Sequence, residues 1–457
     1  MVVAILKVVP LGMSGKYCAS GGVGRRTLRY GVLLTQYALS NENREESAMK
    51  SGYSALVPLV GAPFLPLTFL ARLPLAMLTI GSMTLVTATT GSYALGGLAA
   101  AMVGLGSAVG GPGIGYMADR FGQRPILMTV AFIHSVLLVL LTLLGNSGPD
   151  LSVGLLVLMC LITGATGPQV GPMSRVRWIA MTRQQKKNPK VLTAALSLES
   201  MFDELGFVFG PVAVGLLASL VNPVLPLYLA AIMTLVLVPI FATHSTSHSV
   251  KPVKSTTSTA KVKITGAQVA AISTLVLGMM ALGTVFGSSA AGTLAFAGDQ
   301  GNSNEGGLLY GAMGLSSAIA AISVAAWPQY FRQINRWVLC GGLLTILSFG
   351  LHLAHTTPWM IVALFVAGFA VGPVIVTVMT LGGEVAPASR LSTVMTMLSA
   401  GIVVGTAIGN GLAGVFAESL GYLGAFWVST GGALVILLAA LAMKLLVAKA
   451  PSLSRVR

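Results

Sequence analysis

Apolar runs of about 20 residues, separated by short polar stretches, follow one another along most of this chain. A helix of roughly 20 residues is long enough to cross the hydrocarbon layer of a membrane. The pattern therefore predicts an all-α membrane protein with twelve transmembrane helices. The expected spans are residues 66–89, 92–117, 125–145, 152–173, 195–220, 223–242, 267–296, 306–327, 337–355, 358–382, 391–416 and 422–446.

The polar stretch 244–265 is rich in Ser, Thr, His and Lys, which is typical of a solvated linker, and it divides the spans into six and six. A weak internal repeat supports duplication, because 327–340 can be aligned with 115–128. Gly206 and Gly210 likewise align with Gly401 and Gly405. We predict two pseudo-symmetric six-helix halves, as a rocking transporter requires. The expected domains are a cytoplasmic N-terminal tail 1–60, a first half 61–243, a linker 244–265, a second half 266–447 and a cytoplasmic C-terminal tail 448–457.

Residues 1–48 mix Gly, Arg, Ser and Asn without any helical or strand periodicity. They have no apolar run long enough for a signal peptide. We expect them to form a tail without fixed structure. Alternatively, synthesis begins at Met49 and the segment before it is not translated.

Composition supports the membrane assignment. Hydrophobic residues make up 55% of the chain and charged residues only 9%, whereas a soluble domain carries roughly 25% charged residues. The net charge of +15 does not indicate nucleic-acid binding, because the basic residues are spread over short loops between apolar runs. Cys18, Cys160 and Cys340 lie far apart and lack metal-ligand spacing, so we expect neither a metal site nor a disulfide framework.

Lys and Arg occur in the loops after even-numbered spans and are absent from the loops after odd-numbered spans. Positive residues favour the cytoplasmic side of a membrane protein. We therefore expect a multi-pass protein of the cell membrane (plasma or inner membrane) with both termini in the cytoplasm.

The loop between the second and third spans reads Gly115, three residues, Asp119, Arg120, one residue, Gly122, one residue and Arg124. This order and place resemble the signature loop of the major facilitator superfamily. The likeness in spans, topology and halves covers about residues 60–450. It implies two six-helix halves that enclose a cavity and a loop that latches the halves together in one conformation.

Physical reasons for such a latch can be read from the residues. Gly115 has no Cβ, so a second helix can pack closely against it. Asp119 can accept hydrogen bonds at the N-terminus of a neighbouring helix, where the dipole favours an anion. Arg120 and Arg124 can pair with acids or with the lipid surface. Alternatively, these charges only fix the topology. Gln123 departs from the basic residue that the family often has there.

The fifth span carries three carboxylates within six residues, Glu199, Asp203 and Glu204. An ionised acid inside a membrane is costly, so such groups face a cavity, pair with a cation or bind a proton. We expect Asp203 to be the proton carrier and Glu204 the next candidate. Alternatively, Glu199 lies at the cytoplasmic interface and all three acids brace Arg175 or Arg177 in salt bridges.

Further along the same span, Gly206, Gly210 and Pro211 resemble part of the antiporter motif of proton-driven drug exporters. The match is partial, because paired glycines do not follow. Arg72, near the start of the first span, either pairs with Asp203 or an anionic group, or extends its charged head to the interface.

These features predict a secondary active transporter without cofactors, driven by a proton gradient. Export of a small, partly hydrophobic molecule by a monomer in the bilayer is the first hypothesis, and sugar or metabolite efflux or uptake is the second. A membrane sensor or scaffold that reuses the fold is an alternative of another class. The chain contains no Walker A loop, HExxH or GxSxG motif, so we do not expect an enzyme.

Overall fold

The computed structural model describes residues 53–91, 93–146, 152–185, 189–250, 265–300, 306–328 and 330–450. Within these ranges the regular elements are all helices and no strand is present. Twelve helical segments are long and apolar enough to cross a membrane. The predicted all-α fold with twelve spans is confirmed. The expectations for 1–48, most of the linker and the end of the C-terminal tail lie outside the described residues.

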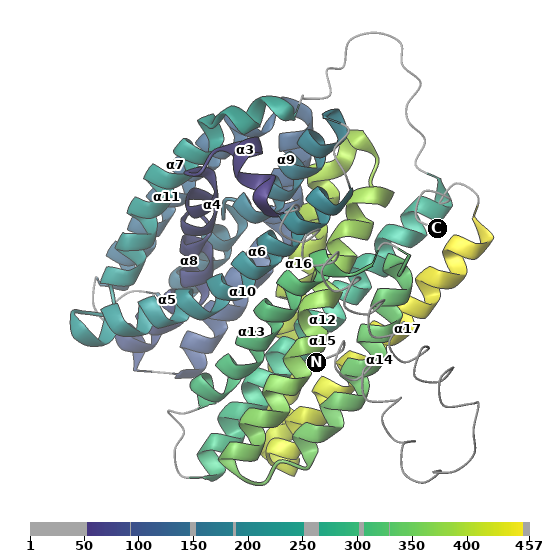
Figure 1. Ribbon diagram of the computed structural model, residues 1–457. Helices are drawn as coiled ribbons and strands as arrows, with labels where there is room; N and C mark the ends of the chain where they lie inside the picture. Colours follow the sequence, from purple (N-terminus) through teal and green to yellow (C-terminus); the bar gives the residue numbers. More distant parts are fainter. Residues whose placement is uncertain are drawn as a thin grey trace, which may run out of the picture. The chain divides into compact units, whose positions relative to one another are not determined.

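The first half consists of nine helical segments, and the last eight of them form six spans (Figure 1). They are α3 (Leu56–Val60), α4 (Phe64–Leu70), α5 (Leu73–Thr90), α6 (Tyr93–Phe121), α7 (Gln123–Gly145), α8 (Val153–Ala165), α9 (Val170–Gln184), α10 (Pro189–Leu220) and α11 (Leu225–Thr243). Helix α3 lies in the range assigned to the N-terminal tail, and its Leu56 and Val60 are buried.

The second half follows a short 3-10 turn, η1 (Ser245–Ser249), which lies at the start of the expected linker. Its elements are α12 (Gly266–Asp299), α13 (Gly306–Ser323), η3 (Val324–Ala326), α14 (Gln333–His352), α15 (Thr357–Val385), η4 (Ala388–Arg390), α16 (Leu391–Leu420) and α17 (Tyr422–Lys449). A capping box at Thr265 and Gln268 starts α12, because each side chain satisfies a free N–H group of the other residue.

Two spans of the first half are interrupted. The first span is α4 and α5 with a break at Ala71 and Arg72, and the fourth is α8 and α9 with a break at 166–169. Pro168 accounts for the second break, because proline disfavours helical conformation in the residue before it and has no N–H to donate. The fourth span extends to Gln184, well beyond the predicted end at 173, because the arginines of α9 find partners inside the bundle.

The two halves repeat the same helix contacts. Helix α6 packs on α8 as α13 packs on α15, and α7 packs on α11 as α14 packs on α17. Glycines allow the first pair in both halves. A Cβ at Gly110 would overlap the backbone of Ala165, and a Cβ at Gly372 would overlap that of Ser317. Such overlap means that the helices approach backbone to backbone.

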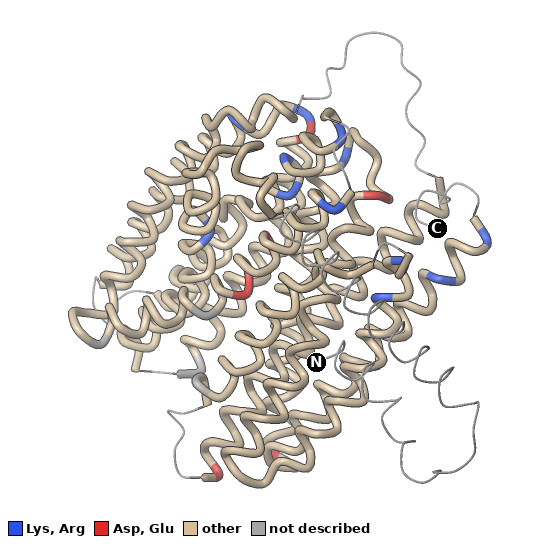
Figure 2. Tube along the Cα trace, in the orientation of Figure 1, with Lys and Arg blue, Asp and Glu red and all other residues tan. Residues whose placement is uncertain are grey.

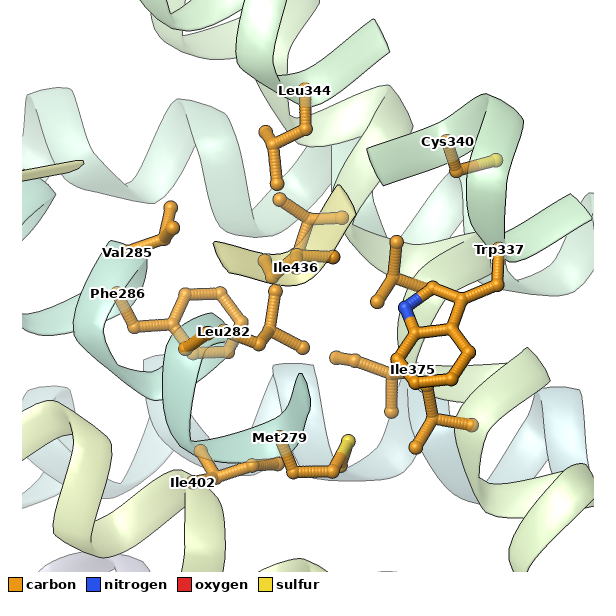
Figure 3. Packing of buried hydrophobic residues seen from close by; sticks show 14 of the residues in the cluster. Met279, Leu282, Val285, Phe286, Trp337, Cys340, Leu344, Ile375, Ile402 and Ile436 are labelled. Atoms are coloured by element: carbon orange, nitrogen blue, oxygen red, sulfur yellow. The ribbon is translucent and has the colours of Figure 1, made fainter. Parts of the chain in front are cut away.

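The largest buried apolar cluster lies in the second half (Figure 3). It brings together side chains of α12, α14, α15, α16 and α17, including Phe286, Trp337 and Ile436. Val176 and Ile179 of α9 also belong to it. The first half therefore contributes to the core of the second half where the two meet.

Charges are distributed unevenly along the bundle (Figure 2). Lys and Arg gather at the end where α6, α9 and α11 finish and α10 and α16 begin. Among the described residues, the opposite helix ends carry Asp299 and Glu418 and no Lys or Arg. This is the pattern of the positive-inside rule. The cytoplasmic location of the basic end remains a prediction.

Candidate functional site

Asp119, near the C-terminus of α6, binds the N-terminus of α16. Its Oδ1 accepts the Ser392 N–H at 2.9 Å, and its Oδ2 accepts the Thr393 N–H at 2.8 Å and the Thr393 hydroxyl at 2.7 Å. The first N–H groups of a helix have no partner within the helix, and the helix dipole favours an anion there. The contact expected for Asp119 is present. It joins the two halves, and we call it the latch.

Two glycines of the signature loop make this geometry possible. A Cβ at Gly115 would overlap the Thr396 hydroxyl and lie 2.9 Å from the Ser392 carbonyl oxygen, so a larger residue would push α6 and α16 apart. Gly122, between α6 and α7, has φ +93°, a conformation that other residues rarely adopt. Arg120 and Arg124 are exposed and form no ion pair with a described carboxylate.

Gln123 is buried, and it connects α7 to α9. Its Oε1 accepts a hydrogen bond from Arg177 Nε at 2.9 Å, and its amide donates to the Met173 carbonyl at 3.3 Å. Arg177 also donates to the Phe241 carbonyl at 2.8 Å and to Thr246 at 3.0 Å, and no described acid pairs with it. The departure from the family pattern thus provides an uncharged acceptor for a buried arginine.

Beyond the end of α11, His244 lies near this arginine. Burial and the positive charge of Arg177 lower the pKa of His244 below its ordinary value. The ring packs on Phe64 at 4.9 Å. A neutral histidine suits this place, because a second positive charge beside Arg177 would be unfavourable.

Arg72 lies at the break between α4 and α5 and is only 6% exposed. Its Nη1 donates to Asp203 Oδ1 at 2.7 Å, its Nη2 pairs with Glu199 Oε2, and its Nε donates to the Thr68 carbonyl at 3.0 Å. Of the two alternatives for Arg72, pairing inside the bundle is therefore correct. The first span is held to α10 through this residue.

Arg175 of α9 binds the other oxygen of the same aspartate, with 2.5 Å between Nη2 and Asp203 Oδ2. Arg175 is fully buried, whereas Asp203 is 26% exposed. Asp203 thus lies between two guanidinium groups. We call Arg72, Arg175, Glu199 and Asp203 the ion cluster.

Glu199 lies inside the bundle and is completely buried. Its Oε1 accepts hydrogen bonds from the Ser174 hydroxyl at 2.6 Å and from Trp178 Nε1 at 2.9 Å. The burial is tolerable because both oxygens have donors. Ser174 and Trp178 could not be recognised as partners from the sequence, because neither residue type is unusual in a helix.

Glu204 follows Asp203 directly but has different surroundings. It is 4% exposed, lies beside Ser317 of α13 and is near Tyr310 of the same helix. It forms no ion pair with a described Lys or Arg. Because α10 belongs to the first half and α13 to the second, this carboxyl group lies where the halves meet.

The antiporter-like residues of α10 are not equivalent in the structure. A Cβ at Gly210 would lie 2.8 Å from the Cβ of Ala76 on α5, so this glycine permits close packing of the two helices. A Cβ at Gly206 would meet nothing within 4 Å. Pro211 lies inside α10, where it removes one helix hydrogen bond.

Several contacts that join the halves were missed from the sequence. Arg183 Nη2 donates to the Gly383 carbonyl at 2.6 Å, and the Arg390 guanidinium lies 5.5 Å from the centre of the Tyr116 ring. The Tyr53 hydroxyl donates to the Ile322 carbonyl at 2.9 Å. No local pattern indicates such pairs, since each connects residues far apart in the chain.

Comparisons with known proteins agree with this architecture. The Major Facilitator Superfamily model matches residues 64–397 and 335–457. No curated protein matches the sequence. The human organic anion transporter MFSD10 (TETRAN) is structurally similar, with 16% identity, a TM-score of 0.61 and coverage of 82% of this chain and 98% of that chain. A bacterial homologue of the iron transporter ferroportin in an outward-facing state is also similar. Its identity is 15% and its TM-score 0.63, and the match covers 83% of this chain and 99% of that chain. These two likenesses show the fold. With the family match over most of its length, the chain belongs to the major facilitator superfamily of membrane transporters.

Proposed function

We propose that this protein is a secondary active transporter that exports a small, partly hydrophobic molecule by alternating access, in exchange for protons. The observation that carries the proposal is Glu204, a buried carboxyl group without a basic partner among the described residues, at the contact between the two halves. Such a group can couple proton binding to the separation of α10 and α13.

The energetic argument concerns the charge of Glu204 in two conformations. A buried carboxylate without a basic partner is costly to ionise, so closing the contact with α13 is expected to favour the uncharged group. When the halves separate and water reaches the group, the ionised form becomes favourable. Proton binding and contact closure are then linked, and by reciprocity each promotes the other.

Asp203, the first candidate from the sequence, is less suited to this role. Arg72 and Arg175 both donate to its carboxylate, so a change at Asp203 would remove a partner from two buried guanidinium groups. The geometry therefore favours the bracing alternative for Asp203 and proton binding for Glu204.

The latch supplies the reversible contact that alternating access requires. Asp119 accepts hydrogen bonds from free N–H groups of α16, and water can satisfy these groups after the halves separate. The export direction is supported by the partial antiporter motif of α10, in which Gly210 packs on α5.

Purified protein in liposomes tests the proposal. A panel of lipophilic cations, neutral drugs and organic anions is offered with and without an imposed pH gradient, and proton movement is followed with an enclosed pH dye. We expect at least one substrate to accumulate against its gradient and to drive proton flux in the opposite direction.

Glu204→Gln should abolish accumulation driven by the pH gradient while exchange of labelled for unlabelled substrate continues. Glu418→Gln, which changes an exposed acid at the opposite helix ends, is the matched control and should behave as wild type. Gradient-driven accumulation by Glu204→Gln at the wild-type rate would show that this carboxyl group is not the carrier.

A further inference from the structure

Because the two halves are related by an internal repeat, a second contact equivalent to the latch is expected at the aligned positions. With 327–340 aligned on 115–128, the counterpart of Asp119 is Phe331. With Gly401 aligned on Gly206, the counterpart of Ser392 is Ser197. A second latch would therefore join Phe331 to the region of Ser197. It cannot form, because Phe331 has no carboxylate. Its ring instead stacks on the Trp327 ring, with 5.7 Å between the ring centres.

The helix that would receive the second latch also differs. Helix α16 begins at Leu391, whose counterpart is Leu196, but α10 already begins at Pro189. The N–H groups around Ser197 are therefore inside a helix and are used by its hydrogen bonds. An acid placed there would find no free N–H groups. The α10–α13 interface needs a different kind of contact from the α6–α16 interface.

Residues 53–60, which we call the strap, lie at this place. The Tyr53 hydroxyl is next to the buried Ser197 hydroxyl of α10, and it donates to the Ile322 carbonyl at 2.9 Å. Ile322 lies in the last turn of α13, where carbonyl groups have no partner within the helix. The strap therefore satisfies a free carbonyl of the second half from a position beside the first half.

The strap is anchored by its apolar side chains. Leu56 and Val60 are buried in a cluster with Phe64 and Trp178 of the first half and Ala325 of η3 in the second half. Burial also raises the pKa of Tyr53 to about 12, so the hydroxyl keeps its proton and remains a donor across the physiological pH range. One short segment thus contacts both halves through packing and through a hydrogen bond.

We infer that the strap is a second latch, which holds the α10–α13 interface closed as Asp119 holds the α6–α16 interface. Tyr53 is then a positioning residue for the conformational cycle. Opening at this end of the bundle requires release of the Tyr53 hydroxyl from Ile322 as well as release of Asp119 from α16. The inference rests on the proposed function only in that the two halves separate at this end.

The test measures opening at both interfaces, α6–α16 and α10–α13. Single cysteines at Thr396, buried at the α6–α16 interface, and at Ser197, buried next to Tyr53, are introduced into full-length protein without native cysteines. Their reaction rates with a water-soluble maleimide report how often each interface opens. No gradient or substrate is needed, so a failure of proton coupling leaves this measurement intact.

Tyr53→Phe removes only the hydroxyl and should raise the labelling rate several-fold at both positions, as loss of one hydrogen bond implies. Leu56→Ala removes an anchor of the strap and should raise both rates further. Tyr330→Phe is the matched control, since its ring is 87% exposed at the same end of the bundle, and it should change neither rate.

Two results would overturn the inference. If Tyr53→Phe and Leu56→Ala raise labelling at Ser197 alone, the strap is only a local cover over α10. If neither rate changes in either variant, the strap does not restrain opening at all. Faster labelling at Thr396, which lies at the α6–α16 interface, is the result that a second latch requires.

Discussion

In the first half, α10 is held to its neighbours by buried charges, whereas in the second half the related helix α16 is held by close backbone contact. Glu199 and Asp203 of α10 bind Arg72 and Arg175. The positions aligned with the two acids are Val394 and Leu398, and both are buried apolar residues.

Glycines show the same difference. A Cβ at Gly405 would overlap the Met280 carbonyl oxygen of α12, whereas the aligned Gly210 leaves 2.8 Å to the Cβ of Ala76 on α5. A Cβ at Gly401 would lie 3.2 Å from the Val276 carbonyl oxygen, and one at the aligned Gly206 would meet nothing. The second half is therefore packed more tightly along this pair of helices. The first half has room for polar groups there, and it is the half that carries the acids.

The largest effect is expected from loss of one charge in the ion cluster. Glu199→Gln leaves two buried arginines with one carboxylate, and breaking a buried ion pair costs about 3–5 kcal/mol. Val394→Ala, at the aligned position, removes only two methyl groups and should cost about 2 kcal/mol. Thermal unfolding in one detergent compares the two. Equal losses of stability would show that the ion cluster adds nothing beyond packing.

Gly→Ala substitutions on α16 and α10 should differ in their cost to stability. Gly405→Ala forces α12 and α16 apart and should cost about 3 kcal/mol, the upper range for overpacking. Gly210→Ala should cost less, because the added Cβ would lie 2.8 Å from the Cβ and 2.9 Å from the carbonyl carbon of Ala76, whereas at Gly405 it would lie 1.8 Å from the Met280 carbonyl oxygen. Gly206→Ala should be neutral or stabilise the protein by about 0.5–1 kcal/mol, as in other helix interiors. The reverse order of melting temperatures would contradict the difference in packing.

A third comparison concerns two aligned loop arginines, Arg336 of the second half and Arg124 of the first half. Arg336 is buried, and it donates to the Phe331 carbonyl at 2.7 Å and to the Pro328 carbonyl at 2.8 Å. Arg336→Gln should cost about 1.5–3 kcal/mol, because charge-assisted hydrogen bonds are lost. The aligned Arg124 is exposed, so Arg124→Gln should change stability by less than about 0.5 kcal/mol. A similar cost for both would mean that the loops have the same structural role.

Asp119→Asn should lower stability by only about 1–2 kcal/mol, because it weakens a helix N-terminal contact without burying a new charge. Its main effect is on the conformational equilibrium, so turnover should fall more than substrate affinity. Transport and binding are measured in the same liposomes, with Arg120→Gln as control. Unchanged turnover at matched membrane abundance would count against the latch.

The sequence predicted features that depend on local patterns. Twelve spans follow from the length of the apolar runs, and the Asp119 contact follows from a motif with a physical rationale. The pairing of Arg72 with Asp203 was one of two alternatives read from the sequence, and the structure contains it. The second partner of Arg72, Glu199, lies 127 positions further along the chain and was not predicted. The role of Gln123 was missed because its partner Arg177 was expected to bind acids. Long-range pairs depend on how the helices are packed, which no local pattern contains.

The position of Arg72 in the chain has a consequence for assembly during synthesis. The first span emerges from the ribosome with a charge between its two helical segments α4 and α5, and its carboxylate partners follow only with the fifth span. A charged side chain within a lone transmembrane helix disfavours insertion, by about 2.5–3.5 kcal/mol at the centre and by less toward the ends. We therefore expect the first span to be stably inserted only after α10 has entered the bilayer. The spans of the first half would then not become stable in the order in which they are synthesised.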